Sequence, residues 1–195
     1  MEQKYKELQN QIKKANNIIV FSHVNPDGDT LGSNLAISMV IEKHFNKPVD
    51  SVYVGNMPNI YSYLPEFSRF KDVAQIDKNK KYDLAIAVDV ASKDRMVTGT
   101  SIFDNSSYKV NIDHHITNNG YADLNIIDGH AACVGVILYD IFKFWSTEIT
   151  KDVARCIYTS LMTDTGGFKY ENTTPETFLL AAELVRLGVS PSFEY

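Results

Sequence analysis

The sequence is poor in cysteine and contains no long apolar run. Its 195 residues include two cysteines, Cys133 and Cys156, too few for the disulfide framework of a small secreted domain. A transmembrane helix needs about 20 consecutive apolar residues, and no stretch approaches that length. The polar N-terminus, residues 1–6, also lacks the apolar segment of a secretory signal. We therefore expect neither a membrane protein nor a secreted one, and the reducing cytoplasm is the predicted location.

Basic residues are not in excess either. Asp and Glu number 24 against 19 Lys and Arg, which gives a formal net charge of -5. This balance argues against broad electrostatic capture of duplex nucleic acid, because proteins that bind it usually present a basic face or stripe. If some of the acidic residues bind divalent cations, the charge of those cations would make the pocket around them locally positive. A small anionic substrate therefore remains compatible with the composition.

Internal repeats, low-complexity tracts and interior linkers are also lacking, so the length fits one domain. Apolar runs predict buried strands at residues 18–21, 49–54, 84–88 and 108–112. Apolar positions at helical spacing predict helices at residues 8–15, from Leu31 to about Pro48, and at 134–145, 153–162 and 177–187. Short strands that alternate with helices are typical of the α/β class. We expect a mostly parallel five-stranded sheet with helices on both faces, whose ligands bind beyond the carboxyl ends of the strands.

Aspartate and histidine follow apolar segments at four places in the chain. These are the loop from His23 to Asp29, Asp89, the triplet Asp113-His114-His115, and Asp164. Each place has a plain structural alternative: an Asp-rich turn, a helix N-cap, a satisfied polar turn and a carboxylate at a helix end. All four alternatives together would require several coincidences. Oxygen and imidazole ligands on two nearby cations are what hydrolysis at phosphorus needs, so we predict a two-metal hydrolytic centre. Its expected ligands are His23, Asp27, Asp29, Asp89, His114 and Asp164.

These motifs resemble those of the DHH phosphoesterase superfamily, which includes RecJ-like exonucleases, nano-RNases, cyclic-dinucleotide phosphodiesterases and family II inorganic pyrophosphatases. The resemblance covers residues 23 to about 168. It implies two divalent ions, Mn²⁺ by preference, and water activated between them for direct hydrolysis. It also implies that His23 and Asp27 hold one ion, that Asp29, His114 and Asp164 hold the other, and that Asp89 bridges the two. The expected catalytic residues are Asp89, His115, which would face the phosphate, and Asp113, which would orient the adjacent imidazole.

Glycines beside the predicted ligands resemble the nano-RNase branch of that superfamily. Gly28 stands between two aspartates, Gly32-Ser33 follows, and Thr163 to Phe168 includes Gly166-Gly167. Glycine at such places lets a backbone approach a nucleotide phosphate closely. Arg95 could contact phosphate as well, but we interpret it as an exposed helix arginine. The resemblance implies hydrolysis of short oligoribonucleotides or of 3',5'-phosphoadenosine phosphate, without specificity for duplex nucleic acid.

The C-terminal residues and the exact activity leave other interpretations open. We interpret residues 1–188 as the catalytic domain and residues 189–195 as the start of a linker to a second, substrate-binding domain that this chain lacks. Alternatives within the superfamily are a cyclic di-AMP phosphodiesterase, a single-strand exonuclease, and a pyrophosphatase or exopolyphosphatase. An alternative of another class is a metal- or nucleotide-binding module without turnover. Mg²⁺, Co²⁺ and Fe²⁺ are not excluded by ligand type.

Overall fold

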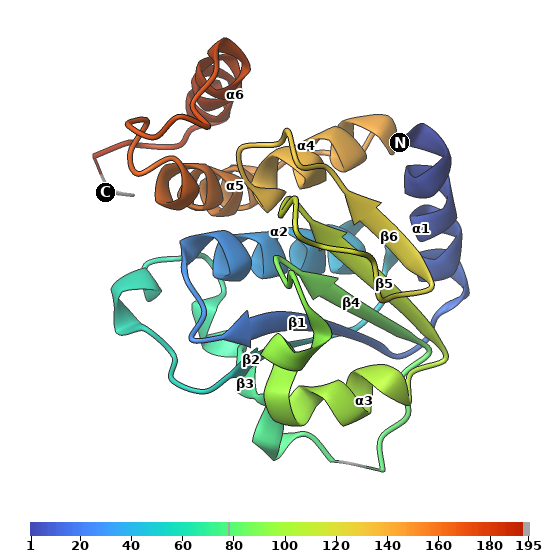
Figure 1. Ribbon diagram of the computed structural model, residues 1–195. Helices are drawn as coiled ribbons and strands as arrows, with labels where there is room; N and C mark the ends of the chain where they lie inside the picture. Colours follow the sequence, from blue (N-terminus) through green and yellow to red (C-terminus); the bar gives the residue numbers. More distant parts are fainter. Residues whose placement is uncertain (78, 193–195) are drawn as a thin grey trace.

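A parallel β-sheet forms the centre of the molecule in the computed structural model, which describes residues 1–77 and 79–192 (Figure 1). Its six strands lie in the order β3-β2-β1-β4-β5-β6, and every neighbouring pair is parallel. The strands are β1 (Ile18–Val24), β2 (Val49–Val54), β3 (Lys71–Asp72), β4 (Leu84–Val88), β5 (Tyr108–Asp113) and β6 (Leu124–Ile127). The α-helices are α1 (Glu2–Lys14), α2 (Gly28–Phe45), α3 (Thr100–Asp104), α4 (Val134–Phe144), α5 (Lys151–Asp164) and α6 (Pro175–Arg186). Short 3₁₀ segments are η1 (Asn59–Tyr61), η2 (Phe67–Arg69), η3 (Val73–Gln75) and η4 (Lys93–Gly99).

The α/β class and the parallel sheet are confirmed, but the expected number of five strands is wrong. The two edge strands, β3 and β6, are two and four residues long. An edge strand this short does not contain enough residues to show the apolar run or the alternation by which a strand is recognised in sequence. The sheet therefore extends further at its edges than the apolar runs indicate. The expected linker, residues 189–195, extends past the described part of the chain, since residues 193–195 lie outside it.

Helical elements cover both faces of the sheet, as predicted, but unequally. Val20 of β1 belongs to a large core with α1, α2, α4 and α5, and these long helices lie on one side of the strands (Figure 1). Its neighbour Phe21 points to the opposite face and joins a smaller core with Met96 of η4 and Phe103 of α3. This alternation follows from the two-residue period of a strand. Both faces are consequently buried, so a ligand is expected to bind at the carboxyl ends of the strands.

Helix α2 begins earlier than the sequence pattern predicts. Asp27 is its N-cap, and the carboxylate of Asp27 accepts hydrogen bonds from the backbone amides of Asp29 (3.0 Å) and Thr30 (3.1 Å). Asp29 therefore lies in the first turn of a helix, not on a loop as we expected, because an aspartate cap satisfies the free amides of a helix start. The helix is buried from Gly28 to Ile41, and it ends at Phe45, close to the predicted proline.

The remaining predicted helices are all present, although α1 begins at Glu2 and not near Leu8. Helices α4, α5 and α6 coincide with the three predicted C-terminal helices, and Thr174 caps α6 with a reciprocal capping box. Helix α5 packs against α2 at Gly32, where an added Cβ would lie 2.4 Å from the carbonyl oxygen of Cys156. The α2–α5 contact is thus a close backbone approach. Within the part of the chain that the structure describes, no helix is long and apolar enough to span a membrane.

Candidate metal centre

All the predicted ligands gather at the carboxyl ends of the central strands. His23 is in β1 and Asp89 directly follows β4. Asp113 is the last residue of β5, and His114 and His115 follow it. Asp27 and Asp29 begin α2, and Asp164 is the last residue of α5. The chain proceeds from β1 to β2 and β3 on one side and then to β4, β5 and β6 on the other. The centre therefore lies at the switch point of the sheet, where the connections diverge and leave a crevice.

A first cluster consists of His23, Asp27 and Asp89, each of which offers one ligand atom within 4.8 Å of the others. The Nε2 atom of His23 lies 3.3 Å from Oδ2 of Asp89 and 3.8 Å from Oδ2 of Asp27. Because Oδ1 of Asp27 caps helix α2, its second oxygen is the one turned to the cluster. Two carboxylate oxygens and one imidazole nitrogen converge there.

A second cluster consists of Asp29, His114 and Asp164, again with ligand atoms within 4.8 Å. The Nε2 atom of His114 lies 3.0 Å from Oδ2 of Asp164 and 3.6 Å from Oδ2 of Asp29. It also lies 3.7 Å from Oδ1 of Asp89. Asp89 thus presents Oδ2 to the first cluster and Oδ1 to the second, which is the arrangement of a carboxylate between two cations.

Asp89 has an unpartnered buried oxygen, an unusual backbone conformation and a raised carboxyl pKa. Its Oδ1 atom is buried and has no hydrogen-bond partner among the described residues. Its backbone has a positive φ of 58°, a left-handed conformation that is unusual for a residue other than glycine and recurs at functional sites. Burial first, and then the charges of Asp29, Asp27, Asp164 and Asp113, raise the pKa of its carboxyl well above the ordinary value. An unpartnered buried oxygen among repelling carboxylates fits a bound cation.

Asp29 is held by three helices. Its carboxylate accepts hydrogen bonds from Ser160 of α5 (2.6 Å), Ser33 of α2 (3.1 Å) and the backbone amide of Val134 at the start of α4 (3.1 Å). Burial and the neighbouring Asp164 raise the pKa of Asp29 to about 7, although these donors and His114 oppose the shift. The position of Asp29 is thereby fixed without a metal, as is usual for ligands supported by outer hydrogen bonds.

The protonation of His114 and His23 is set by opposite surroundings. Burial alone would lower the pKa of His114, but its hydrogen bond with Asp164 and the charge of Asp29 raise the pKa to about 9. Burial lowers the pKa of His23, and the nearby guanidinium of Arg95 contributes in the same direction. Since an imidazole must be unprotonated to bind a metal, protons compete with a cation for His114 more strongly than for His23.

His115 is more exposed than the two other histidines of the centre, His23 and His114. The side chain of His115 is 37% exposed, against 14% for His114 and 5% for His23. Its Nδ1 lies 2.8 Å from Oδ1 of Asp113, so the imidazole that Asp113 contacts is that of His115. The ring of His114 instead lies 3.3 Å from the carbonyl oxygen of Ala131.

Asp113 is in turn fixed by a buried amide. Asn118 donates a hydrogen bond to Oδ2 of Asp113 at 2.6 Å and lies 2.7 Å from Oδ1 of Asn111. Burial opposes ionisation of Asp113, but the hydrogen bonds from His115 and Asn118 outweigh it and lower the pKa of this carboxyl. Asp113 therefore stays ionised and keeps the proton of His115 on Nδ1, which leaves Nε2 toward the open side.

Packing within the protein requires a glycine at position 28. A Cβ at this position would lie 2.1 Å from Oγ1 of Thr163 and 2.9 Å from the ring of Tyr61. The space beside Gly28 is thus filled by the protein's own side chains, which join the segment of Asp27 and Asp29 to that of Asp164.

Sequence reasoning missed Ser160 and Asn118, and it misjudged Arg95. The two supporting residues lie far in sequence from their partners or in a region without a motif, so no local pattern indicates them. Arg95 is partly buried on η4 and is not an exposed helix arginine, and its Nη2 lies 3.1 Å from Nδ1 of His23. The closeness of Arg95 to Asp89 in sequence was the one available signal.

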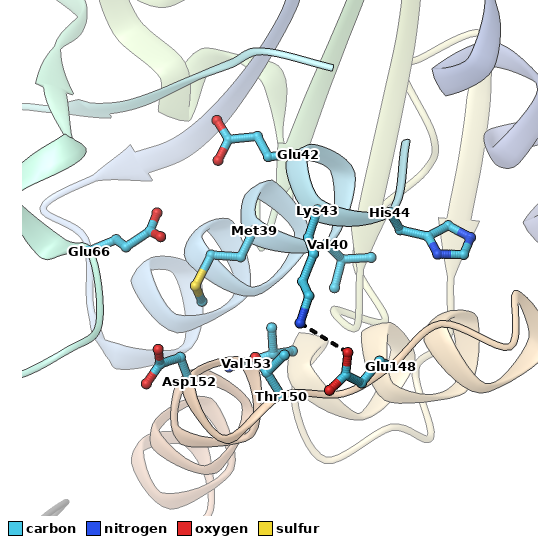
Figure 2. A pocket seen from close by; sticks show the side chains of 10 residues that line it. All are labelled: Met39, Val40, Glu42, Lys43, His44, Glu66, Glu148, Thr150, Asp152 and Val153. Carbon is cyan, nitrogen blue, oxygen red and sulfur yellow. Dashed lines mark hydrogen bonds and ion pairs between the residues drawn. The ribbon is translucent and has the colours of Figure 1, made fainter. Parts of the chain in front are cut away.

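A separate groove of about 630 Å³ lies between the C-terminal half of α2 and the first turn of α5 and contains none of the predicted site residues (Figure 2). Glu42 and Glu66 in its wall are paired with Arg69. Glu148 forms an ion pair with Lys43 at 2.9 Å (Figure 2). Three of its four carboxylates thus have a cationic partner, and the groove does not resemble the centre at the strand ends.

Comparisons with known proteins agree with this geometry. Residues 17–161 match the family model described as DHH family, N-terminal domain. The chain is 32% identical over 172 residues to the bifunctional oligoribonuclease and PAP phosphatase NrnA of Thermus thermophilus. The matched residues make up 88% of this chain and 50% of that protein. It is 31% identical over 182 residues to the probable bifunctional oligoribonuclease and PAP phosphatase NrnA of Streptococcus mutans, with 93% and 56% covered.

A solved structure shows the same fold. The crystal structure of an exopolyphosphatase-related protein from Bacteroides fragilis superposes with a TM-score of 0.91 at 22% identity, over 100% of this chain and 59% of that one. The chain spans about half the length of the curated relatives it matches. The resemblance to the nano-RNase branch, expected from the glycine motifs, is confirmed by those relatives. Since the family model covers most of its length, the chain belongs to the DHH family.

Proposed function

We propose that this chain is a metal-dependent phosphoesterase that hydrolyses short oligoribonucleotides, 3',5'-phosphoadenosine phosphate, or both. The observation that carries the proposal is Asp89, whose two oxygens face two separate ligand clusters. A carboxylate in that place suits a two-metal hydrolase, because both the attacking and the leaving oxygen of a phosphate then lie near a cation. The activities named for the Thermus and Streptococcus relatives support this choice of substrates. Residues 1–188 would form the catalytic unit.

The proposed ligand assignment follows the clusters. His23 and Asp27 would hold one ion, and Asp29, His114 and Asp164 the other, with Asp89 between them. Oxygen and imidazole donors suit Mn²⁺, which is the metal we propose. Two bound divalent cations would lower the pKa of a water molecule and offset negative charge on the phosphoryl oxygens.

His115 would act on the substrate and not on a metal. Because Asp113 accepts the Nδ1 proton, Nε2 of His115 is the atom that meets a phosphate or leaving group at the open side. Asp113, held by Asn118, would keep the ring of His115 oriented. Removing such a proton donor typically costs about 10²- to 10⁴-fold in rate.

Paired histidine variants test this division of roles. We expect His114→Ala to lose Mn²⁺ from the second cluster, whereas His115→Ala keeps both ions and loses turnover by about 10²-fold or more. Metal content is measured by isothermal titration calorimetry. Turnover is measured with Mn²⁺ on short oligoribonucleotides, 3',5'-phosphoadenosine phosphate, cyclic di-AMP and pyrophosphate.

The control is His44→Ala, since His44 lies near the C-terminal end of α2, in the wall of the separate groove. This variant should bind Mn²⁺ and turn over substrate like the unmodified chain. Equal metal loss in the His114 and His115 variants would show that their roles are wrongly assigned. Mn²⁺ binding without turnover of any of the four substrates would contradict the proposal and favour a non-catalytic binding module.

A further inference from the structure

Arg95 is a partly buried cation directed at the metal centre without a carboxylate partner. Its Nη2 atom lies 3.1 Å from Nδ1 of His23. Within the described chain it forms no ion pair, whereas Lys93, on the same 3₁₀ segment, pairs with Asp104 at 2.9 Å. A partly buried guanidinium has five donors that lose hydration, so an unpaired one of this kind needs an anion.

The backbone holds Arg95 in this place. Met96, the next residue, is fully buried in the smaller core, and the Arg95 amide donates a hydrogen bond to the carbonyl oxygen of Ser92 at 3.1 Å. Val97 then has φ of 47°, a conformation that β-branched residues rarely adopt. Backbone conformations of this kind persist where the surrounding structure enforces them, often beside functional sites.

The hydrogen-bonding capacity of His23 decides what Arg95 can bind. Nδ1 of His23 is 2.9 Å from the carbonyl oxygen of Val24. If Nε2 of His23 gives its lone pair to a cation, the single ring proton is on Nδ1 and is donated to Val24. Nδ1 then has no lone pair for Arg95. A metal-loaded centre therefore leaves the guanidinium with free donors a few ångströms from the cluster of His23, Asp27 and Asp89.

We propose that Arg95 is a substrate-binding residue whose guanidinium binds a phosphoryl oxygen of the nucleotide held at the centre. The inference rests on the proposed function and extends it by assigning an anion site outside the metal ligands. Guanidinium groups suit this task because their planar donors match two oxygens of a phosphate at once. The same contact would position the phosphate against the first cluster.

The test compares Arg95→Met with Lys93→Met, which removes the same charge from the same segment but from an exposed, paired side chain. Binding of Mn²⁺, and then of adenosine monophosphate to the Mn²⁺-loaded chain, is measured by calorimetry. We expect Arg95→Met to weaken nucleotide binding by about ten- to a hundredfold, as for the loss of a hydrogen-bonded charge. Its Mn²⁺ affinity should stay within about threefold of the unmodified chain, a change of less than 1 kcal/mol. Lys93→Met should change neither value.

Arg95→Lys, which keeps the charge but not the planar donors, should recover part of the nucleotide affinity. Unchanged nucleotide binding in Arg95→Met, or no nucleotide binding by the Mn²⁺-loaded unmodified chain, would overturn the inference. Loss of Mn²⁺ in parallel with the nucleotide would also overturn it, because Arg95 would then act only by orienting His23. Nucleotide binding that depends on Arg95 in a chain without turnover would contradict the proposed function and leave this inference standing.

Discussion

Replacing Ser160 tests whether the hydrogen bond that it donates to Asp29 contributes to stability and to metal binding. Its side chain is fully buried, and its hydroxyl donates a hydrogen bond to Asp29 at 2.6 Å and accepts one from the backbone amide of Gly135 at 3.0 Å. Ser160→Ala leaves the Gly135 amide without its acceptor and removes one donor from Asp29. Each lost partner of a buried polar group costs about 1–3 kcal/mol. Asp29 keeps Ser33 and Val134 as donors, so we expect a loss of about 2–4 kcal/mol in the free energy of unfolding.

The same substitution should weaken metal binding. Residues that orient a ligand from outside typically contribute about 10- to 100-fold to metal affinity, which is about 1.4–2.7 kcal/mol. Stability is measured by urea denaturation and Mn²⁺ affinity by calorimetry, both at pH 8, where Asp29 with a pKa of about 7 is mostly ionised.

Ser106→Ala is the matched control. Ser106 is also buried, at 4% exposure, but its hydroxyl donates to the carbonyl oxygen of Ile102 at 2.8 Å, away from the centre. This variant should lose about 1 kcal/mol or less and bind Mn²⁺ normally. If Ser160→Ala binds Mn²⁺ as tightly as Ser106→Ala does, the support that Ser160 gives to Asp29 has no part in metal binding, and the reasoning fails.

Two further predictions concern stability away from the centre. Burial alone would raise the pKa of Asp50, but hydrogen bonds from Lys71, Lys80 and Tyr82 lower it from 3.8 to about 2. A carboxyl whose pKa is lowered on folding stabilises the folded state above about pH 4, and this stabilisation is lost as the pH falls through about 2. Asp50→Asn should therefore cost about 1–2 kcal/mol at pH 7 after allowance for the exposed lysines. A difference in urea midpoint between this variant and the unmodified chain that does not shrink as the pH falls from 5 toward 2 would disprove the linkage. Gly32→Ala should cost about 1–3 kcal/mol or more, because its Cβ would lie 2.4 Å from the carbonyl oxygen of Cys156; a melting temperature equal to that of the unmodified chain would mean that α2 and α5 separate without strain.

The central strands were predictable from local patterns, and so was the gathering of the proposed ligand residues at the strand ends. Leu84–Val88 is a continuous apolar run that ends at an aspartate, and the structure places Asp89 at the carboxyl end of a fully buried strand. A parallel sheet brings such ends together, so the side chains that follow them meet. The six predicted ligands accordingly lie in two clusters, although each one had a plain structural alternative when taken alone.

What could not be predicted depends on contacts across the chain. Ser160 and Asp29 are 131 residues apart, and no spacing in the sequence indicates their hydrogen bond. The triplet indicated that Asp113 orients an imidazole, but only the path of the chain after β5 decides that it contacts His115. Arg95 appeared exposed in sequence because a cation in a polar segment usually is. In the structure Arg95 is partly buried, because the next residue, Met96, packs in the smaller core behind η4.

Asp27 has a consequence for how the motif can vary. One carboxylate oxygen closes the first turn of α2, and the other faces the cluster of His23 and Asp89. The start of the helix and the position of the ligand oxygen therefore depend on the same side chain. Insertions that surface loops tolerate cannot occur between His23 and Asp29 without moving either the helix or the ligand. The spacing of these residues is thus constrained by backbone geometry as well as by chemistry, and this is why so short a stretch of a single sequence can identify the site.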